Sequence, residues 1–90
     1  MLDKDKLYVV SSDYDGWEYA IATPEKVIKT DDTWHDPHFM DFAHGFAYGR
    51  GLDVKRVVIS DTKDLEDNRQ LLEHVGLYDT YKDSFEEIYG

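Results

Sequence analysis

Residues 34–51 read WHDPHFMDFAHGFAYGRG, and this segment holds three of the four phenylalanines in the chain. Asp36 as an N-cap, followed by Pro37 at the first helical position, is a typical helix start. At about 100° per residue, the apolar side chains fill one arc of a helical wheel; they are Phe39, Met40, Phe42, Ala43, Phe46 and Ala47. The stretch therefore predicts an amphipathic helix from Pro37 to Tyr48 that ends near Gly49 or Gly51.

Two glycines, Gly45 and Gly49, stand beside Phe42 on this wheel. A glycine inside a helix costs about 0.5–1 kcal/mol relative to alanine. Close packing against another element, or fraying of the helix end, is one explanation. The other is a groove in which the backbone of a partner or ligand approaches the helix.

The helix is preceded by a predicted β-hairpin, formed by residues 7–14 and 17–23 around the turn Asp15-Gly16. One face of the hairpin should carry Tyr8, Val10, Ser12, Tyr14, Trp17, Tyr19 and Ile21. The other should carry Leu7, Val9, Ser11, Ala20 and Ala22, and its small residues suit close packing of the phenylalanine-rich helix with Phe39, Phe42 and Phe46 buried. After the hairpin, Thr23-Pro24-Glu25 predicts either a helical turn or two, or an extended edge.

Three further elements follow the central helix. Residues 54–60 (VKRVVIS) predict a strand buried on both faces. Residues 64–75 predict a helix closed by Gly76, and residues 80–89 predict another. We therefore expect one α+β domain over residues 1–90, in which a hairpin and a third strand form a three-stranded sheet. The central helix and two C-terminal helices should pack on this sheet.

Composition restricts the partners of this domain. The chain has no cysteine, and twenty acidic and ten basic residues give a formal net charge of −10. This charge is larger than the magnitude of about 2–8 that a small domain usually carries. The negative electric field that it produces attracts basic proteins and repels nucleic-acid phosphates and anionic membranes. The chain has neither an apolar leader nor an apolar run of about 18 residues, so a cytoplasmic location is expected.

The sequence gives little support for metal binding or catalysis. His35, His38 and His44, with Asp41, suggest a metal site only weakly, because their spacing spreads them over the polar side of the helix. The chain has no nucleophile, phosphate-binding or dinucleotide motif. We therefore expect no cofactor and no catalysis, and a metal-dependent enzyme is the most distant hypothesis.

Protein binding remains, in two forms. In the first, an acidic face imitates nucleic acid and inhibits or modulates a DNA- or RNA-binding protein, as some phage and mobile-element inhibitors of host defence do; this comparison is an analogy of class. Its carboxylates would be Glu66, Asp67, Glu73, Asp79, Asp83, Glu86 and Glu87. In the second, Tyr14, Trp17 and Tyr19 bind a partner or a second copy of the chain, since aromatic residues are enriched in interface cores.

Overall fold

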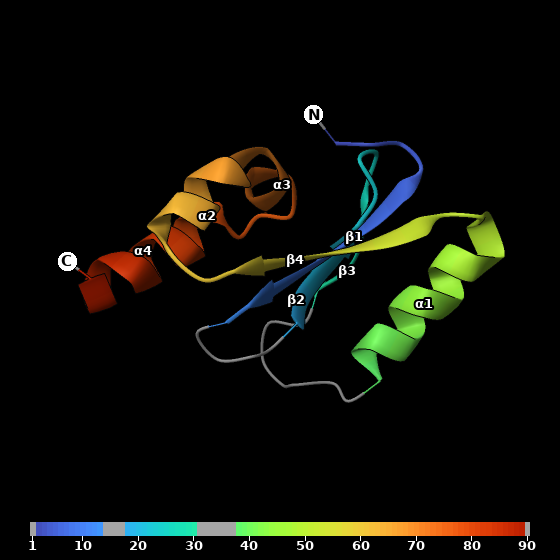
Figure 1. The fold of residues 1–90 in the computed structure, drawn as a ribbon, viewed down its shortest axis with the longest axis horizontal. Helices are drawn as coiled ribbons and strands as arrows, with labels where there is room; N and C mark the ends of the chain where they lie inside the picture. Colours follow the sequence, from blue (N-terminus) through green and yellow to red (C-terminus); the bar gives the residue numbers. More distant parts are fainter. Residues whose placement is uncertain (1, 14–17, 31–37, 90) are drawn as a thin grey trace.

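A sheet of four strands lies between two helical layers in the computed structural model of the chain (Figure 1). The structure describes residues 2–13, 18–30 and 38–89, without the side chains of Glu18, Ile88 and Tyr89. The protein is thus a small compact α+β domain. Within the described ranges, none of the helices is long and apolar enough to cross a membrane.

The sheet is mixed and has the order β3-β2-β1-β4. Its strands are β1 (Lys6–Ser12), β2 (Glu18–Ala22), β3 (Val27–Thr30) and β4 (Asp53–Ile59). β2 runs antiparallel to both β1 and β3, whereas β4 runs parallel to β1. The predicted three-stranded sheet is therefore one strand short, since β3 was not counted as a strand.

β3 exists because a tight turn folds the chain back after β2. The amide of Thr23 donates to the carbonyl of Lys26 at 2.9 Å, and the amide of Lys26 donates to Thr23 Oγ1 at 3.3 Å. Pro24 and Glu25 lie within this turn, where proline and polar residues are common. Of the two interpretations of this segment, the extended edge is confirmed.

β4 forms the other edge of the sheet and is less buried than predicted. Val57 and Ile59 are buried against the C-terminal helices, but Val58 points to the opposite face and is 43 % exposed. On that face, the contacts of α1 (Phe39–Arg50) with Leu52 and Val54 lie near the beginning of the strand. The prediction that β4 is buried on both faces is wrong, because α1 does not cover its end.

A β-bulge in β2 changes the pairing of the hairpin. Ser11 is paired with Glu18, whereas Val10 is paired with Ala20, so Tyr19 is an extra residue in β2. Side chains alternate between the two faces of a strand, and one inserted residue moves all later side chains to the opposite face. The alternation of apolar and polar residues in the sequence does not reveal this extra residue.

The bulge decides which side chains share a face. The face under α1 buries Leu7, Val9 and Ile21 with Phe39, Ala43 and Ala47. The face under the C-terminal helices buries Tyr8, Val10, Ala20 and Ala22 together with Val57, Ile59, Leu65 and Leu72. The predicted grouping of Ala20 and Ala22 with Leu7 and Val9 is wrong, and so is that of Ile21 with Tyr8 and Val10.

α1 confirms most of the predicted central helix. It ends at Gly51, whose φ of 66° gives the left-handed conformation expected of a glycine terminator. The predicted start at Asp36 and Pro37 lies outside the described residues. Phe42 is 43 % exposed, stacks on Phe46 and lies under the Lys29 ammonium, so its predicted burial is wrong.

The predicted helix over residues 64–75 is two short helices, α2 (Thr62–Asp67) and α3 (Arg69–His74). Asn68 separates them with φ −110° and ψ 21°, and its side-chain amide donates to the Asp64 carbonyl. On a straight helix Leu71 would lie about 120° from Leu65, yet both are buried in one core. The break at Asn68 allows this, and after Gly76 (φ 76°) α4 (Tyr78–Tyr89) completes the layer.

Candidate functional site

α4 presents a row of carboxylates on the side that faces away from the core. Tyr78, Tyr81 and Phe85 are buried against the sheet and α2. The exposed side carries Asp79, Asp83, Glu86 and Glu87. At about 100° per residue, Asp83 lies opposite the centre of the buried side, so the same amphipathic pattern that anchors α4 also orients the acids outward.

Asp79, Asp83 and Glu87 form the row proper, which we call the α4 row. Four residues of α-helix rise about 6 Å, so the α4 row extends about 12 Å along the helix. None of the three forms an ion pair with another residue in the described ranges. Their charges are therefore exposed to solvent.

Glu66 and Glu73, predicted as part of the acidic face, are held by one arginine. Arg69 Nε donates to Glu73 Oε1 at 2.8 Å, and Arg69 Nη1 lies 3.6 Å from Glu66 Oε2. The guanidinium also lies over the Tyr78 ring, 4.5 Å from its centroid, and the Tyr78 hydroxyl donates to Glu66. These bonds raise the pKa of Arg69, chiefly through Glu73, and that of Tyr78, chiefly through Glu66.

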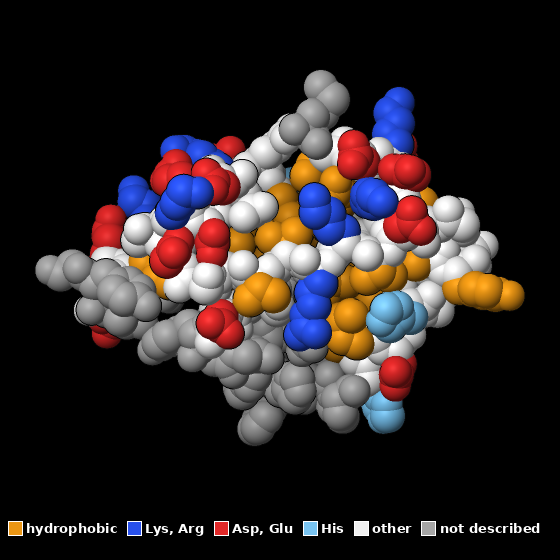
Figure 2. Space-filling model, viewed as in Figure 1, with side chains coloured by type: hydrophobic (Ala, Val, Ile, Leu, Met, Phe, Trp, Pro, Cys, Tyr) orange, Lys and Arg blue, Asp and Glu red, His pale blue; other side chains and the backbone are white. Residues whose placement is uncertain are grey.

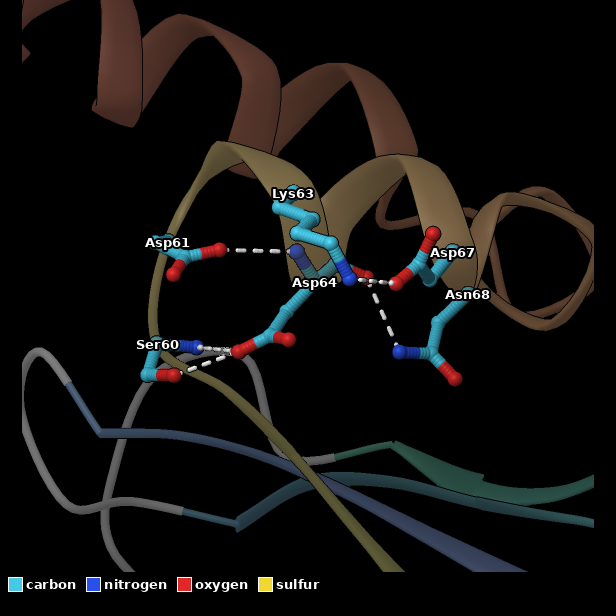
Figure 3. A network of polar contacts seen from close by, with 6 residues as sticks. All are labelled: Ser60, Asp61, Lys63, Asp64, Asp67 and Asn68. Atoms are coloured by element: carbon cyan, nitrogen blue, oxygen red, sulfur yellow. Dashed lines mark hydrogen bonds and ion pairs between the residues drawn. The ribbon is translucent and has the colours of Figure 1, made fainter.

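Asp67 belongs to a polar network at the junction of β4 and α2 (Figure 3). Its carboxylate accepts a hydrogen bond from Lys63 Nζ at 3.0 Å, and this bond raises the lysine pKa. Asp61 caps α2 by accepting from the amide of Asp64 at 2.8 Å. The carboxylate of Asp64 turns back to accept from the amide and hydroxyl of Ser60.

The predicted acidic face is therefore divided. The acids of α2 and α3 are interspersed with basic partners, as the red and blue side chains over these helices show in Figure 2. The α4 row has no such partners in the described part of the chain. The sequence predicted an acidic face that includes these residues, but it did not distinguish free carboxylates from paired ones.

A groove between α2 and α4 adjoins the acids of α4, and nothing in the sequence indicated it. Its volume is about 310 Å³. Leu65, Tyr78 and Phe85 line it from below, and the more exposed Thr62, Glu66, Lys82 and Glu86 complete its lining. The groove arises from tertiary packing, because the break at Asn68 sets the position of α2 against α4.

The aromatic hairpin surface is only partly described. Tyr14 and Trp17 lie outside the described residues. Tyr19 is half-buried and packs against Tyr81, with an interplanar angle of 84° and 5.7 Å between ring centroids. Tyr19 therefore contributes to the contact of the sheet with α4.

The remaining candidates lie on α1. A Cβ atom placed on Gly45 or Gly49 would meet no atom within 4 Å, so no described element packs closely against these glycines. His38 Nδ1 lies 3.5 Å from Asp41 Oδ2, and both side chains are exposed, as is that of His44. Among the residues described, no three histidine, aspartate or glutamate side chains form a cluster that could hold a metal ion, and His35 lies outside that set.

Comparison of the chain with protein-family models, with curated proteins and with solved structures gives no match.

Proposed function

We propose that this chain is a protein-binding domain whose α4 row occupies the nucleic-acid-binding groove of a basic partner and thereby inhibits or modulates it. The observation that carries the proposal is the set of three solvent-facing carboxylates on one rigid helix, Asp79, Asp83 and Glu87, without ion-pair partners in the described ranges. Phosphates of one duplex strand advance about 3.4 Å along the axis. At about 6 Å per step, the α4 row resembles alternate phosphates.

The distribution of charge supports this choice of surface. The chain carries a net charge of −10, so its overall field attracts a cationic partner from a distance. At contact distance, carboxylates already paired with Lys63 or Arg69 offer less to a partner than unpaired ones. The α4 row is therefore the surface at which a basic groove would gain the most favourable electrostatic interaction on binding.

Charge reversal tests the proposal. The variant Asp79→Lys, Asp83→Lys, Glu87→Lys keeps the buried side of α4 and changes the formal net charge from −10 to −4. Asp3→Lys, Asp5→Lys, Glu25→Lys changes it equally at exposed positions outside α4. Each tagged protein is used to capture partners from a cell lysate at low and at high salt, and the captured protein is then purified.

We expect reversal of the α4 row to weaken binding of that purified partner at least about tenfold at low salt, because like charges would face each other. The control variant should lose much less. The wild-type chain should also displace nucleic acid from the partner in a fluorescence-anisotropy assay. Equal binding by wild type and the α4-row variant, or failure to compete with nucleic acid, would contradict the proposal.

A further inference from the structure

The groove between α2 and α4 combines an apolar floor with a polar rim that holds two glutamates, Lys82 and Thr62. Leu65, Tyr78 and Phe85 form the floor and are 4, 8 and 3 % exposed. At about 310 Å³, the groove lies at the lower end of the range of ligand pockets, about 300–1,000 Å³. This size suits one or two side chains better than a cofactor.

The carboxylates around the groove are continuous with those of α4. Glu66 on α2 and Glu86 on α4 both line the opening. On the helical wheel of α4, Glu86 is followed within about 20° by Asp79 and then by Asp83. A cationic segment could therefore lie along α4 while one of its side chains enters the groove.

The wall that contains Glu66 is already held in place. The Tyr78 hydroxyl donates to Glu66, and Arg69 lies over the Tyr78 ring while it pairs with Glu66 and Glu73. A group that enters the groove meets side chains fixed by these bonds, so less conformational entropy is lost on binding.

We infer that this groove is an anchor site for a basic segment of the partner protein, and that it takes one large apolar side chain while neighbouring lysines or arginines contact Glu86 and the α4 row. Charge complementarity selects a basic segment, and the apolar floor selects the anchor. The inference rests on the proposed function, since it concerns how the same partner is recognised.

Two short lysine-rich peptides of equal length and charge provide the test, one with a central tryptophan and one with serine in its place. Their affinities are measured by isothermal titration calorimetry at low ionic strength with the wild-type chain. The tryptophan peptide should bind about tenfold more tightly, because an aromatic side chain leaves water for the groove floor.

Protein variants then show whether the tryptophan of the peptide binds in the groove. Thr62→Trp fills the groove from an exposed position at the start of α2, and it should remove the advantage of the tryptophan peptide. Thr80→Trp, also exposed but outside the groove, should retain that advantage. Lys82→Gln removes the cation at the opening and should strengthen the binding of both peptides. Circular dichroism confirms that each variant is folded.

Failures of the two proposals can be distinguished. Equal affinity of the two peptides for the wild type, or an advantage that survives Thr62→Trp, would overturn the anchor site. If the purified partner nevertheless binds more weakly after reversal of the α4 row, and the wild-type chain displaces nucleic acid from it, the proposed function still holds. If neither peptide binds at low ionic strength, both proposals are contradicted.

Discussion

At the residue scale, Asp64 connects the end of β4 to the start of α2. Its amide donates to Asp61, its carboxylate accepts from Ser60, and its carbonyl accepts from the side chain of Asn68. One residue thus fixes both the entry into α2 and the break after it, and with them the position of α2 beside the groove. The hydrogen bonds from Ser60 lower the pKa of the Asp64 carboxyl.

Asp64 should give a specific acid dependence of stability. Its pKa is lower in the folded than in the unfolded chain, where it is about 3.9. Its contribution is therefore present above that value and is lost as pH falls through the folded pKa. Urea unfolding between about pH 5 and pH 2 should show a smaller loss of stability for Asp64→Asn than for wild type. Parallel curves for the two proteins would contradict this role of Asp64.

At the element scale, α1 carries two glycines that bring no evident internal packing. Gly45 and Gly49 have open space where a Cβ would lie, whereas Gly51, which ends the helix, has a positive φ. Gly45 and Gly49, inside α1, are therefore physically different from Gly51, which caps it, although all three are glycine. Conformational freedom is needed only at Gly51.

Alanine substitutions should separate these roles. Gly45→Ala and Gly49→Ala should each raise the free energy of unfolding by about 0.5–1 kcal/mol, because alanine loses less backbone entropy in a helix. Gly51→Ala should lower it by about 1–2 kcal/mol, because alanine is strained in the left-handed region. Chemical denaturation measures all three. A destabilised Gly45→Ala or Gly49→Ala variant would indicate that a neighbour packs against that position.

Some features of the helices and strands could be predicted from the sequence, and others could not. Local periodicity predicted α1, an end near Gly49 or Gly51, and the outward direction of the acids on α4; the structure places the end at Gly51. The insertion at Tyr19, the break at Asn68 and the edge position of β4 depend on contacts between distant segments. The pairing of Glu66 and Glu73 with Arg69 is likewise visible only in three dimensions, as is the groove. Patterns thus predicted that the acids of α4 point outward, but they gave the wrong faces for Ala20, Ala22 and Ile21 after the bulge, and packing determined which carboxylates remained unpaired.

At the scale of the whole molecule, acidity and stability oppose each other. A net charge of −10 repels itself within a small volume. The α4 row adds repulsion between neighbouring carboxylates, since like charges four residues apart on a helix destabilise it by about 0.2–0.5 kcal/mol per pair. The charges on α4 therefore cost stability in the free protein, and on the proposed function this cost reflects a surface kept for binding.

A single substitution in the middle of the α4 row should reveal this cost. Asp83→Lys replaces two repulsive pairs, with Asp79 and Glu87, by attractive ones, and should raise the free energy of unfolding by about 1 kcal/mol at low salt. Asp3→Lys changes the net charge equally, outside α4, and should have a smaller effect. In about 1 M salt the Debye length is about 3 Å, so the difference between the two variants should largely disappear when thermal unfolding is repeated there.

On the proposed function, Asp83→Lys should bind the basic partner more weakly although it is more stable. A variant that is both more stable and equally good at binding would indicate that Asp83 does not contact the partner.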